Sequence, residues 1–336
     1  MNIIFRVDAT KKIGIGHLMR CIALSEELNK RGHRCYFISH ILGKNLKEKV
    51  IKRNNFLVEI KKINDLELDL KYLLKFSDEH NIDWVITDHY EINSNYLKKI
   101  KKNGFNLLSI DDTAQTYYYS DIVVNQNAGA DKLDIKGEDY TTFLLGPKYV
   151  MLRDELLKRE EKKIKKDVGN LLITIGGTDK DNYTLKILKQ IKDVKIKKIV
   201  IIGALNPHYL EIKDYIKNTT DVEVVISPNN MFDLYKKAYI AISAGGTTCY
   251  ELAYFGIPNI IITVADNQLN IAKELDKKNV SMYLGKKEEI SSKKLKENVL
   301  KLINNTSLRK QMAKNGMKLV DGNGKKRIIE VMNTFK

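Results

Sequence analysis

The chain has little cysteine, proline or tryptophan: three cysteines, four prolines and one tryptophan in 336 residues. Cys21, Cys35 and Cys249 show neither metal-ligand nor Cys-x-x-Cys spacing, which argues against a zinc site or a disulfide framework. An odd number of cysteines indicates reduced thiols. The N-terminus also lacks the basic and apolar regions of a signal peptide. We therefore expect a cytoplasmic protein.

The sequence also lacks an unbroken apolar run that fits a transmembrane helix. Its most apolar stretch, residues 239–266, carries one charge, Glu251, before Asp266. Gly245-Gly246 and Gly256-Ile257-Pro258 interrupt this stretch. The stretch fits better as a strand, a glycine turn, a short helix and a second strand, with both strands buried. We expect no stable membrane insertion.

Acidic residues are fewer than basic ones, 42 against 58, and the net charge is +16. Such an excess is typical of proteins that bind anions or nucleic acid. The excess here is mostly lysine, spread along the chain, whereas base recognition favours arginine. We interpret it as a solvated surface and expect no nucleic-acid partner; attraction to anionic substrates or to a membrane surface is the alternative.

Strand-like and helix-like segments alternate in both halves of the chain. The predicted strands are 2–8, 34–39, 56–60 (weaker), 83–87, 106–110, 121–124, one opening 170–179, 198–203, 222–226, 239–243 and 259–264; the clearest helices are 17–32, 94–104, 291–303, 305–318 and 324–335. This alternation is typical of parallel, doubly wound sheets.

The pattern predicts an α/β fold of two Rossmann-like domains, 1–150 and 165–320, joined by a segment around 125–165. A helix in 321–336 is expected to pack back on the first domain. Ligands of such sheets bind at the carboxyl ends of the strands, so two facing domains predict a site in a cleft.

Three glycine turns follow predicted strands. The first, Gly14-Ile15-Gly16, fits no dinucleotide fingerprint, because Met19 stands where the third glycine should be. It also lacks the Gly-Lys-Ser/Thr of a P-loop. Turns of the same kind occur at 176–179 and 243–251. Backbone N–H groups and helix N-termini bind anions, so the three turns predict a diphosphate site. The alternative is that the glycines are needed only for the packing of the turns.

His17 stands where the first predicted helix begins. A helix N-terminus disfavours the imidazolium, which leaves a neutral ring available as a base; capping or packing is the alternative. Asp111 and Asp112 also follow a predicted strand and would line the same wall, unless they only fix turns. The candidate substrate-binding residues are Gly14, Gly16, Arg20, Asp88, His89, Tyr90, Asn125 and Asn127.

Two acidic motifs lie in the second half. Glu251 is placed to accept both hydroxyls of a ribose, or equally to accept from a nearby backbone N–H. Asp179-Lys180-Asp181 matches the D-x-D pattern that holds a metal in some sugar-nucleotide enzymes, but acids in a first helical turn are ordinary caps. We expect no metal and no cofactor.

Several motifs, in chain order, resemble one family. They are "FRVDATKKIGIGHLMRCIALSEEL", "ITDHYEI", "LLSIDDTA", "DIVVNQNAGA", "MLRDE" and "IGGTD", with a looser match at "SAGGTTCYE" and "GIP". The set resembles the hydrolases of pseudaminic acid biosynthesis, which cleave UDP-2,4-diacetamido-2,4,6-trideoxy-β-L-altropyranose to the free sugar and UDP. The looser region is shared by many glycosyltransferase-B-like proteins.

The resemblance implies a glycosyltransferase-B fold and a metal-independent reaction in which water replaces the acceptor. It places the catalytic histidine at His17 and the UDP mainly on the second domain. The implied UDP-binding residues are Gly176, Gly177, Thr178, Gly245, Gly246, Thr247 and Glu251.

Departure of UDP needs charge stabilisation rather than a protonating acid, so one base suffices. We expect His17 to deprotonate a water that attacks C1 opposite UDP, with inversion, in a monomeric protein. The alternatives are a UDP-sugar glycosyltransferase, a hydrolysing UDP-sugar 2-epimerase of the same fold, and a non-catalytic protein that binds nucleic acid or an acidic polymer.

Overall fold

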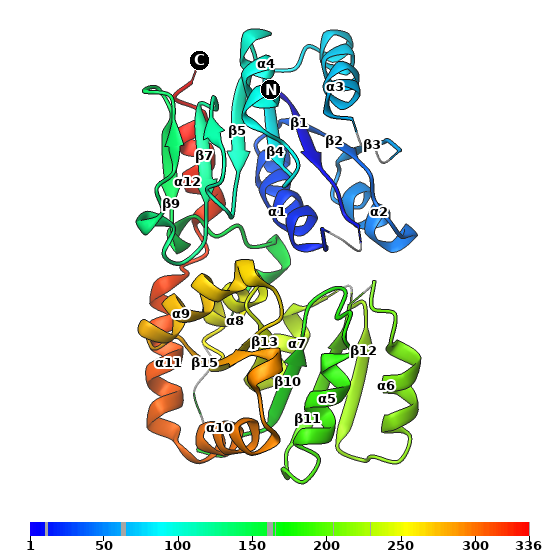
Figure 1. Ribbon diagram of the computed structural model, residues 1–336, viewed down its shortest axis with the longest axis vertical. Coiled ribbons are helices and arrows are strands. Elements are labelled where there is room, and N and C mark those ends of the chain that lie inside the picture. The colour runs from blue at the N-terminus through cyan, green and yellow to red at the C-terminus, as the bar shows by residue number, and fades with distance from the viewer. Residues whose placement is uncertain are drawn as a thin grey trace. The chain divides into compact units, whose positions relative to one another are not determined.

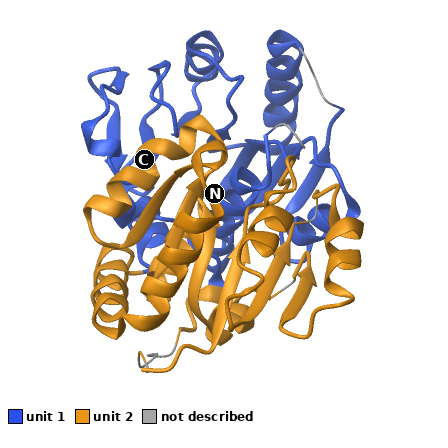
Figure 2. Cartoon of the chain, turned by 60° about the horizontal axis from the view of Figure 1, so that its bottom comes forward, with its two compact units in different colours: residues 1–154, 322–336 blue, residues 155–321 orange. Residues whose placement is uncertain are grey.

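A computed structural model (Figure 1) describes residues 1–10, 13–61, 65–159, 164, 166–203, 205–228 and 230–335. The chain divides into two compact units, coloured separately in Figure 2. The first unit comprises Met1–Asp154 and Gly322–Lys336, and the second comprises Glu155–Asp321. Much of the segment that we expected to join two domains, residues 125–154, therefore belongs to the first unit.

The first unit is built on a seven-stranded sheet of order β3-β2-β1-β4-β5-β7-β9, with all pairs parallel. Its strands are β1 (Asn2–Val7), β2 (Arg34–Ser39), β3 (Phe56–Glu59), β4 (Trp84–Asp88), β5 (Asn106–Ile110), β7 (Ile122–Asn125) and β9 (Thr142–Leu145). Its helices are α1 (Gly16–Lys30), α2 (Lys44–Ile51), α3 (Leu66–His80), α4 (Ser94–Lys102) and α12 (Gly324–Met332). The central strands β1, β4 and β5 are almost entirely buried, as in parallel sheets whose two faces are covered by helices.

The second unit contains a six-stranded parallel sheet of order β12-β11-β10-β13-β14-β15. Its strands are β10 (Asn170–Thr174), β11 (Lys197–Ile202), β12 (Val222–Ile226), β13 (Ala238–Ala244), β14 (Asn259–Thr263) and β15 (Ser281–Lys286). Its helices are α5 (Tyr183–Gln190), α6 (Tyr209–Ile216), α7 (Phe232–Lys237), α8 (Thr248–Tyr254), α9 (Leu269–Lys277), α10 (Ser292–Asn304) and α11 (Thr306–Leu319). In both units, sites at the carboxyl ends of the strands are favoured.

Two strands of these sheets are missing from the sequence prediction. β9 is short and flanked by Thr141 and Gly146, and β15 contains Ser281 and Gly285. Neither shows the long β-branched run that marks β14. Both are edge strands that gain their stability from one neighbour, so tertiary pairing rather than local propensity forms them.

Helix α12 packs within the first unit, against α1 and the turn Pro147–Tyr149. A Cβ built on Gly324 would lie 2.2 Å from the carbonyl oxygen of Val150, so only glycine fits there. Phe335, just beyond the helix, meets Trp84 edge-to-face with ring centroids 6.0 Å apart.

We predict that Gly324→Ala destabilises the first unit by about 1–3 kcal/mol, because the added methyl group must push α12 away from its contact. Trp84 is the only tryptophan and is fully buried, so its emission during denaturant unfolding reports this unit. Gly246→Ala is the control, because a Cβ there meets nothing within 4 Å. An unchanged midpoint in Gly324→Ala would contradict the packing described here.

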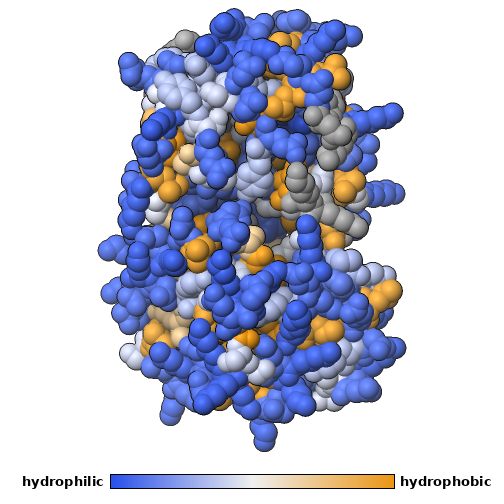
Figure 3. All heavy atoms as spheres, viewed as in Figure 1, coloured by the Kyte–Doolittle hydropathy of each residue, from blue (hydrophilic) through white to orange (hydrophobic). Residues whose placement is uncertain are grey.

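The surface agrees with the interpretation of the positive net charge as a solvated surface. Hydrophilic residues dominate the face shown in Figure 3, and hydrophobic ones are scattered among them. Among the described residues, no helix combines the length and apolar character needed to cross a membrane. All three cysteines are buried, and none of them forms a disulfide.

Candidate active site

The turn between β1 and α1 presents His17. Gly14 adopts a φ of +87°, a conformation that favours glycine, and Gly16 is the first residue of α1. Lys11 and Lys12 in the same turn lie outside the described residues. Ile15 occupies the N-cap position of α1, so His17 is not the capping residue.

His17 is hydrogen-bonded to Asp88, the last residue of β4. The two residues are 7% and 1% exposed, and the distance from His17 Nδ1 to Asp88 Oδ1 is 2.6 Å. β1 and β4 are adjacent and paired in register from Ile3–Trp84 to Val7–Asp88, which brings the start of α1 next to the end of β4.

The charge on Asp88 determines the tautomer of His17. Burial raises the pKa of the Asp88 carboxyl, but the charges of Arg20 and His17 and their hydrogen bonds hold it well below its ordinary value. An ionised carboxylate only accepts hydrogen bonds, so Nδ1 of His17 donates to Asp88 at 2.6 Å. Arg20 Nη2, which can itself only donate, lies farther from Nδ1, at 3.1 Å, and is then a packing contact. Nε2, which has no hydrogen-bond partner among the described residues, is then unprotonated in the neutral ring and can accept a proton. The ring of Tyr90 packs edge-to-face on His17 at 4.6 Å between centroids.

We predict that acid weakens the first unit through this carboxylate. A folded-state pKa below the unfolded value means that the pairing of Asp88 stabilises the fold at neutral pH and that this contribution is lost as pH falls through the folded pKa. The denaturant midpoint from Trp84 emission is therefore expected to fall below about pH 4. Asp88→Asn should show a flatter acid dependence, and an equally steep one would contradict the assignment.

A second buried network lies beside the first, at the end of β1. Arg6 Nη1 is 2.5 Å from Asp8 Oδ1, and its Nε and Nη2 contact Asp69. His89 Nε2 lies 3.1 Å from Asp8 Oδ2, and its Nδ1 accepts from the backbone N–H of Glu91. Both ring nitrogens of His89 are thus engaged within the protein, and the network fixes the loop after β4.

The remaining candidate residues of the first unit gather at the ends of β4, β5 and β7. Arg20 Nη1 is 2.7 Å from Asp112 Oδ1, to which Asn127 Nδ2 also donates at 2.8 Å. Asn125 is fully buried, and its Oδ1 accepts from the backbone N–H of Asn127. Direct contact of Gly14, Gly16, Arg20, Asp88, His89, Tyr90, Asn125 and Asn127 with a substrate stays a prediction.

In the second unit, the turn after β10 is shaped by glycine. Gly176 adopts a φ of +95°, and a Cβ on Gly203 would lie 2.4 Å from Cα of Gly177. The turn that includes Thr178 therefore packs tightly on the one after β11. Asp179 accepts from the backbone N–H groups of Tyr183 and Thr184 at 2.7 and 3.0 Å, which is the role of a helix cap.

The turn after β13 is held by Gln268. Its Oε1 accepts from the N–H groups of Gly245, at 3.3 Å, and Val264, at 2.9 Å. A Cβ on Gly245 would lie 2.9 Å from Cβ of Gln268, whereas one on Gly246 would be unobstructed. Gly245 therefore serves packing, and Gly246 with Thr247 leads into α8. Glu251 on α8 accepts a hydrogen bond from the Tyr235 hydroxyl.

The structure offers little for a metal ion. Among the described residues, His, Cys, Asp and Glu side chains form no cluster of three or more with ligand geometry. Asp179 is a cap, and Asp181 is paired with Lys287.

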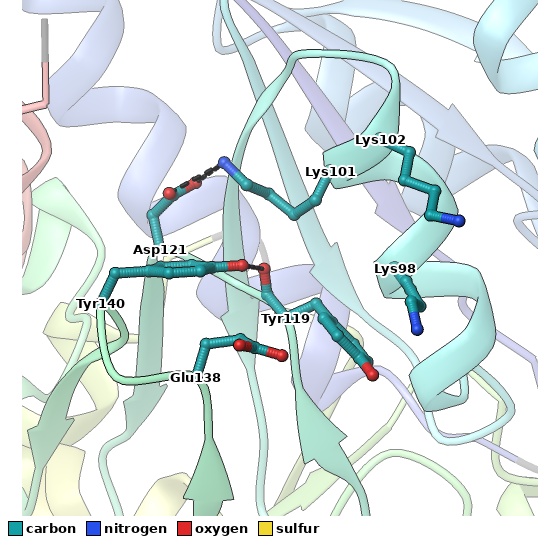
Figure 4. A pocket seen from close by; sticks show the side chains of 7 residues that line it. All are labelled: Lys98, Lys101, Lys102, Tyr119, Asp121, Glu138 and Tyr140. Atoms are coloured by element: carbon teal, nitrogen blue, oxygen red, sulfur yellow. Dashed lines mark hydrogen bonds and ion pairs between the residues drawn. The ribbon is translucent and has the colours of Figure 1, made fainter.

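A pocket of about 490 Å³ lies at the opposite end of the first sheet, near the starts of β7 and β9 (Figure 4). Its lining residues are Lys98, Lys101, Lys102, Tyr119, Asp121, Glu138 and Tyr140. Lys101 is paired with Asp121 at 2.7 Å, and the Tyr140 hydroxyl donates to the Tyr119 carbonyl at 3.0 Å. None of these residues belongs to the cluster around His17.

Comparison with known proteins gives the fold class. The MurG crystal structure from Acinetobacter baumannii superposes with a TM-score of 0.69 at 13% identity, covering 99% of each chain. Residues 170–331 match the glycosyltransferase family 28 C-terminal domain. The chain therefore has the α/β glycosyltransferase-B fold of two Rossmann-like domains, as the sequence predicted.

Several relatives match most of this chain, among them the following two. The spore coat polysaccharide biosynthesis protein SpsG of Bacillus subtilis is 25% identical over 99% of this chain and 98% of its own. The UDP-2,4-diacetamido-2,4,6-trideoxy-β-L-altropyranose hydrolase of Campylobacter jejuni is 25% identical over 83% of this chain and 97% of its own. The resemblance drawn from the motifs is thus confirmed.

Proposed function

We propose that the protein is a UDP-sugar hydrolase that converts UDP-2,4-diacetamido-2,4,6-trideoxy-β-L-altropyranose and water into the free sugar and UDP. The observation that carries the proposal is the buried His17–Asp88 pair, with Nδ1 of the imidazole 2.6 Å from the carboxylate and Nε2 left as an acceptor. The relative from Campylobacter jejuni that bears this activity in its name supports the choice of substrate.

The proposed chemistry needs one base. Nε2 of His17 accepts a proton from water, the water oxygen forms a bond to C1 of the sugar, and the bond from C1 to the UDP oxygen breaks with the electron pair leaving on UDP. Attack opposite the leaving group inverts C1. Asp88 holds the ring and stabilises the imidazolium that forms, as the aspartate of a catalytic triad does.

The departing diphosphate carries the developing charge. In the proposal, the backbone N–H groups of the turn Gly176-Gly177-Thr178 and of Gly246 and Thr247 stabilise that charge. Glu251 binds the ribose, with its carboxylate oriented by Tyr235. The reaction is proposed to need no metal, because aligned N–H dipoles can stabilise a leaving diphosphate.

Proton NMR of the purified, EDTA-treated protein with this substrate tests the proposal. We expect UDP and the free sugar to appear together without an acceptor. A glycosyltransferase would leave the substrate intact until an acceptor is added, and a hydrolysing 2-epimerase would act on UDP-N-acetylglucosamine. Either result would overturn the hydrolase assignment and keep the fold.

A further inference from the structure

We propose that Arg20, anchored by Asp112, is a positioning residue that holds the Asp88 carboxylate aimed at Nδ1 of His17, rather than a ligand of the substrate. The inference rests on the proposed function in one respect, because it assigns Arg20 to the service of the proposed base. It explains why an arginine, and not a lysine, follows His17 by one helical turn.

The guanidinium of Arg20 is engaged by two carboxylates, and its Nη2 also lies 3.1 Å from Nδ1 of His17. Its Nε lies 2.6 Å from Asp88 Oδ2 and its Nη2 lies 2.6 Å from Asp88 Oδ1, a two-point contact that fixes the plane of the carboxylate. Nη1 reaches Asp112 at 2.7 Å. The Arg20 residue is 4% exposed, so little of it is available to a ligand.

Asp112 is itself anchored from a third strand end. It follows β5, and its Oδ1 accepts from Asn127 Nδ2 at 2.8 Å. Asn127 is in turn held by Asn125, the last residue of β7, through the bond from its backbone N–H to Oδ1 at 3.0 Å. The chain of contacts therefore ties α1 to the carboxyl ends of β4, β5 and β7.

The contact between Arg20 and Asp88 bears on the protonation of the His17 ring. Burial raises the pKa of the Asp88 and Asp112 carboxyls, and the charge of Arg20, followed by that of His17, brings both pKa values below the ordinary range. Without the two-point contact from Arg20, the Asp88 carboxylate can turn Oδ1 away from Nδ1 of His17, and the ring proton can then move to Nε2. Nε2 would then be unable to accept a proton from water.

Arg20→Lys tests the role, because lysine keeps the charge but cannot make the two-point contact. The matched control is Arg6→Lys, since Arg6 is equally buried between two carboxylates of the same unit but does not touch Asp88. Long-range ¹H–¹⁵N spectra of protein labelled in histidine report the tautomer of His17, whose signals are those lost in His17→Gln.

The wild type and Arg6→Lys are expected to show Nδ1 protonated and Nε2 unprotonated. In Arg20→Lys we expect this signature to be lost and kcat to fall about 10- to 100-fold, with KM within about twofold. A preserved His17 signature in Arg20→Lys would overturn the proposal, and so would an equal loss of kcat in both variants with the tautomer unchanged.

If Arg20→Lys does not fold, Asp112→Leu and Asp112→Asn replace it. Leucine removes the acceptor for Nη1 and is expected to lower kcat about tenfold with loss of the tautomer signature, whereas asparagine keeps an acceptor and should restore both. Equal behaviour of the two variants would contradict the role of Asp112. The spectra test the positioning even if the named substrate is not hydrolysed, so failure of the proposed function and failure of this inference are distinguishable.

Discussion

His17→Gln is expected to lower kcat for UDP release by about 10²- to 10⁴-fold, the usual contribution of a general base. Glutamine occupies a similar volume and donates from its amide, but it cannot take up a proton at Nε2. UDP affinity should change less than about twofold, because in the proposal the second unit supplies the UDP-binding residues.

The control is His33→Gln, since His33 lies in the same unit and is partnered by the chain terminus rather than by Asp88. It should retain wild-type turnover. A His17→Gln variant that loses UDP affinity as much as turnover would show that His17 serves structure or ground-state binding, and the proposed mechanism would have to be abandoned.

Asp88→Asn is expected to lower kcat about 10⁴-fold, as loss of the orienting carboxylate does in a catalytic triad. Arg20 donates to both oxygens of Asp88, so the amide NH₂ of asparagine meets an N–H donor in either orientation and the contact opens. The neutral amide also cannot stabilise the imidazolium that forms on His17. Where the NH₂ faces His17, Nδ1 becomes the acceptor and the ring proton moves to Nε2, the atom that must accept one.

Two comparisons make this prediction specific. Asp69→Asn alters another buried carboxylate that is paired with an arginine, and it should reduce stability without a comparable loss of kcat. The double variant His17→Gln/Asp88→Asn should be no slower than His17→Gln, because the two residues act as one unit. Additive losses would mean that Asp88 acts independently of His17.

The sequence predicts the fold well because its signals are local. The predicted strands 34–39 and 222–226 coincide with the observed elements, and the glycine turns mark the carboxyl ends of strands. The strands missed at the sheet edges carry no strong β-forming run. Their existence depends on the neighbours β7 and β14, which only the folded sheet provides.

The candidate site is less accessible to sequence reasoning. The position of His17 can be inferred from its turn, but its partner Asp88 lies 71 residues away and depends on β4 being next to β1. The sequence predicts that Arg20 contacts substrate, but nothing local reveals that two carboxylates, at the ends of β4 and β5, pair with it. Asp8 has a signal of its own, a polar residue directly after a buried strand, which resembles the signal of Asp88.

In the second unit, the sequence does not show which loops lie close to one another. Gly203 belongs to no motif, yet it is required by contact with Gly177. Gln268 likewise satisfies the N–H of Gly245 from a segment 23 residues away. Such contacts between loops follow from strand order rather than from local pattern.

The measurement that tests the central claim most directly is single-turnover hydrolysis in H₂¹⁸O, followed by ³¹P and ¹H NMR. The claim is that water activated by His17 attacks C1 of the sugar. It predicts that the first free sugar has the inverted anomeric configuration and that the UDP contains no ¹⁸O. An ¹⁸O label on the terminal phosphate of UDP, with retained configuration at C1, would show attack at phosphorus and contradict the account.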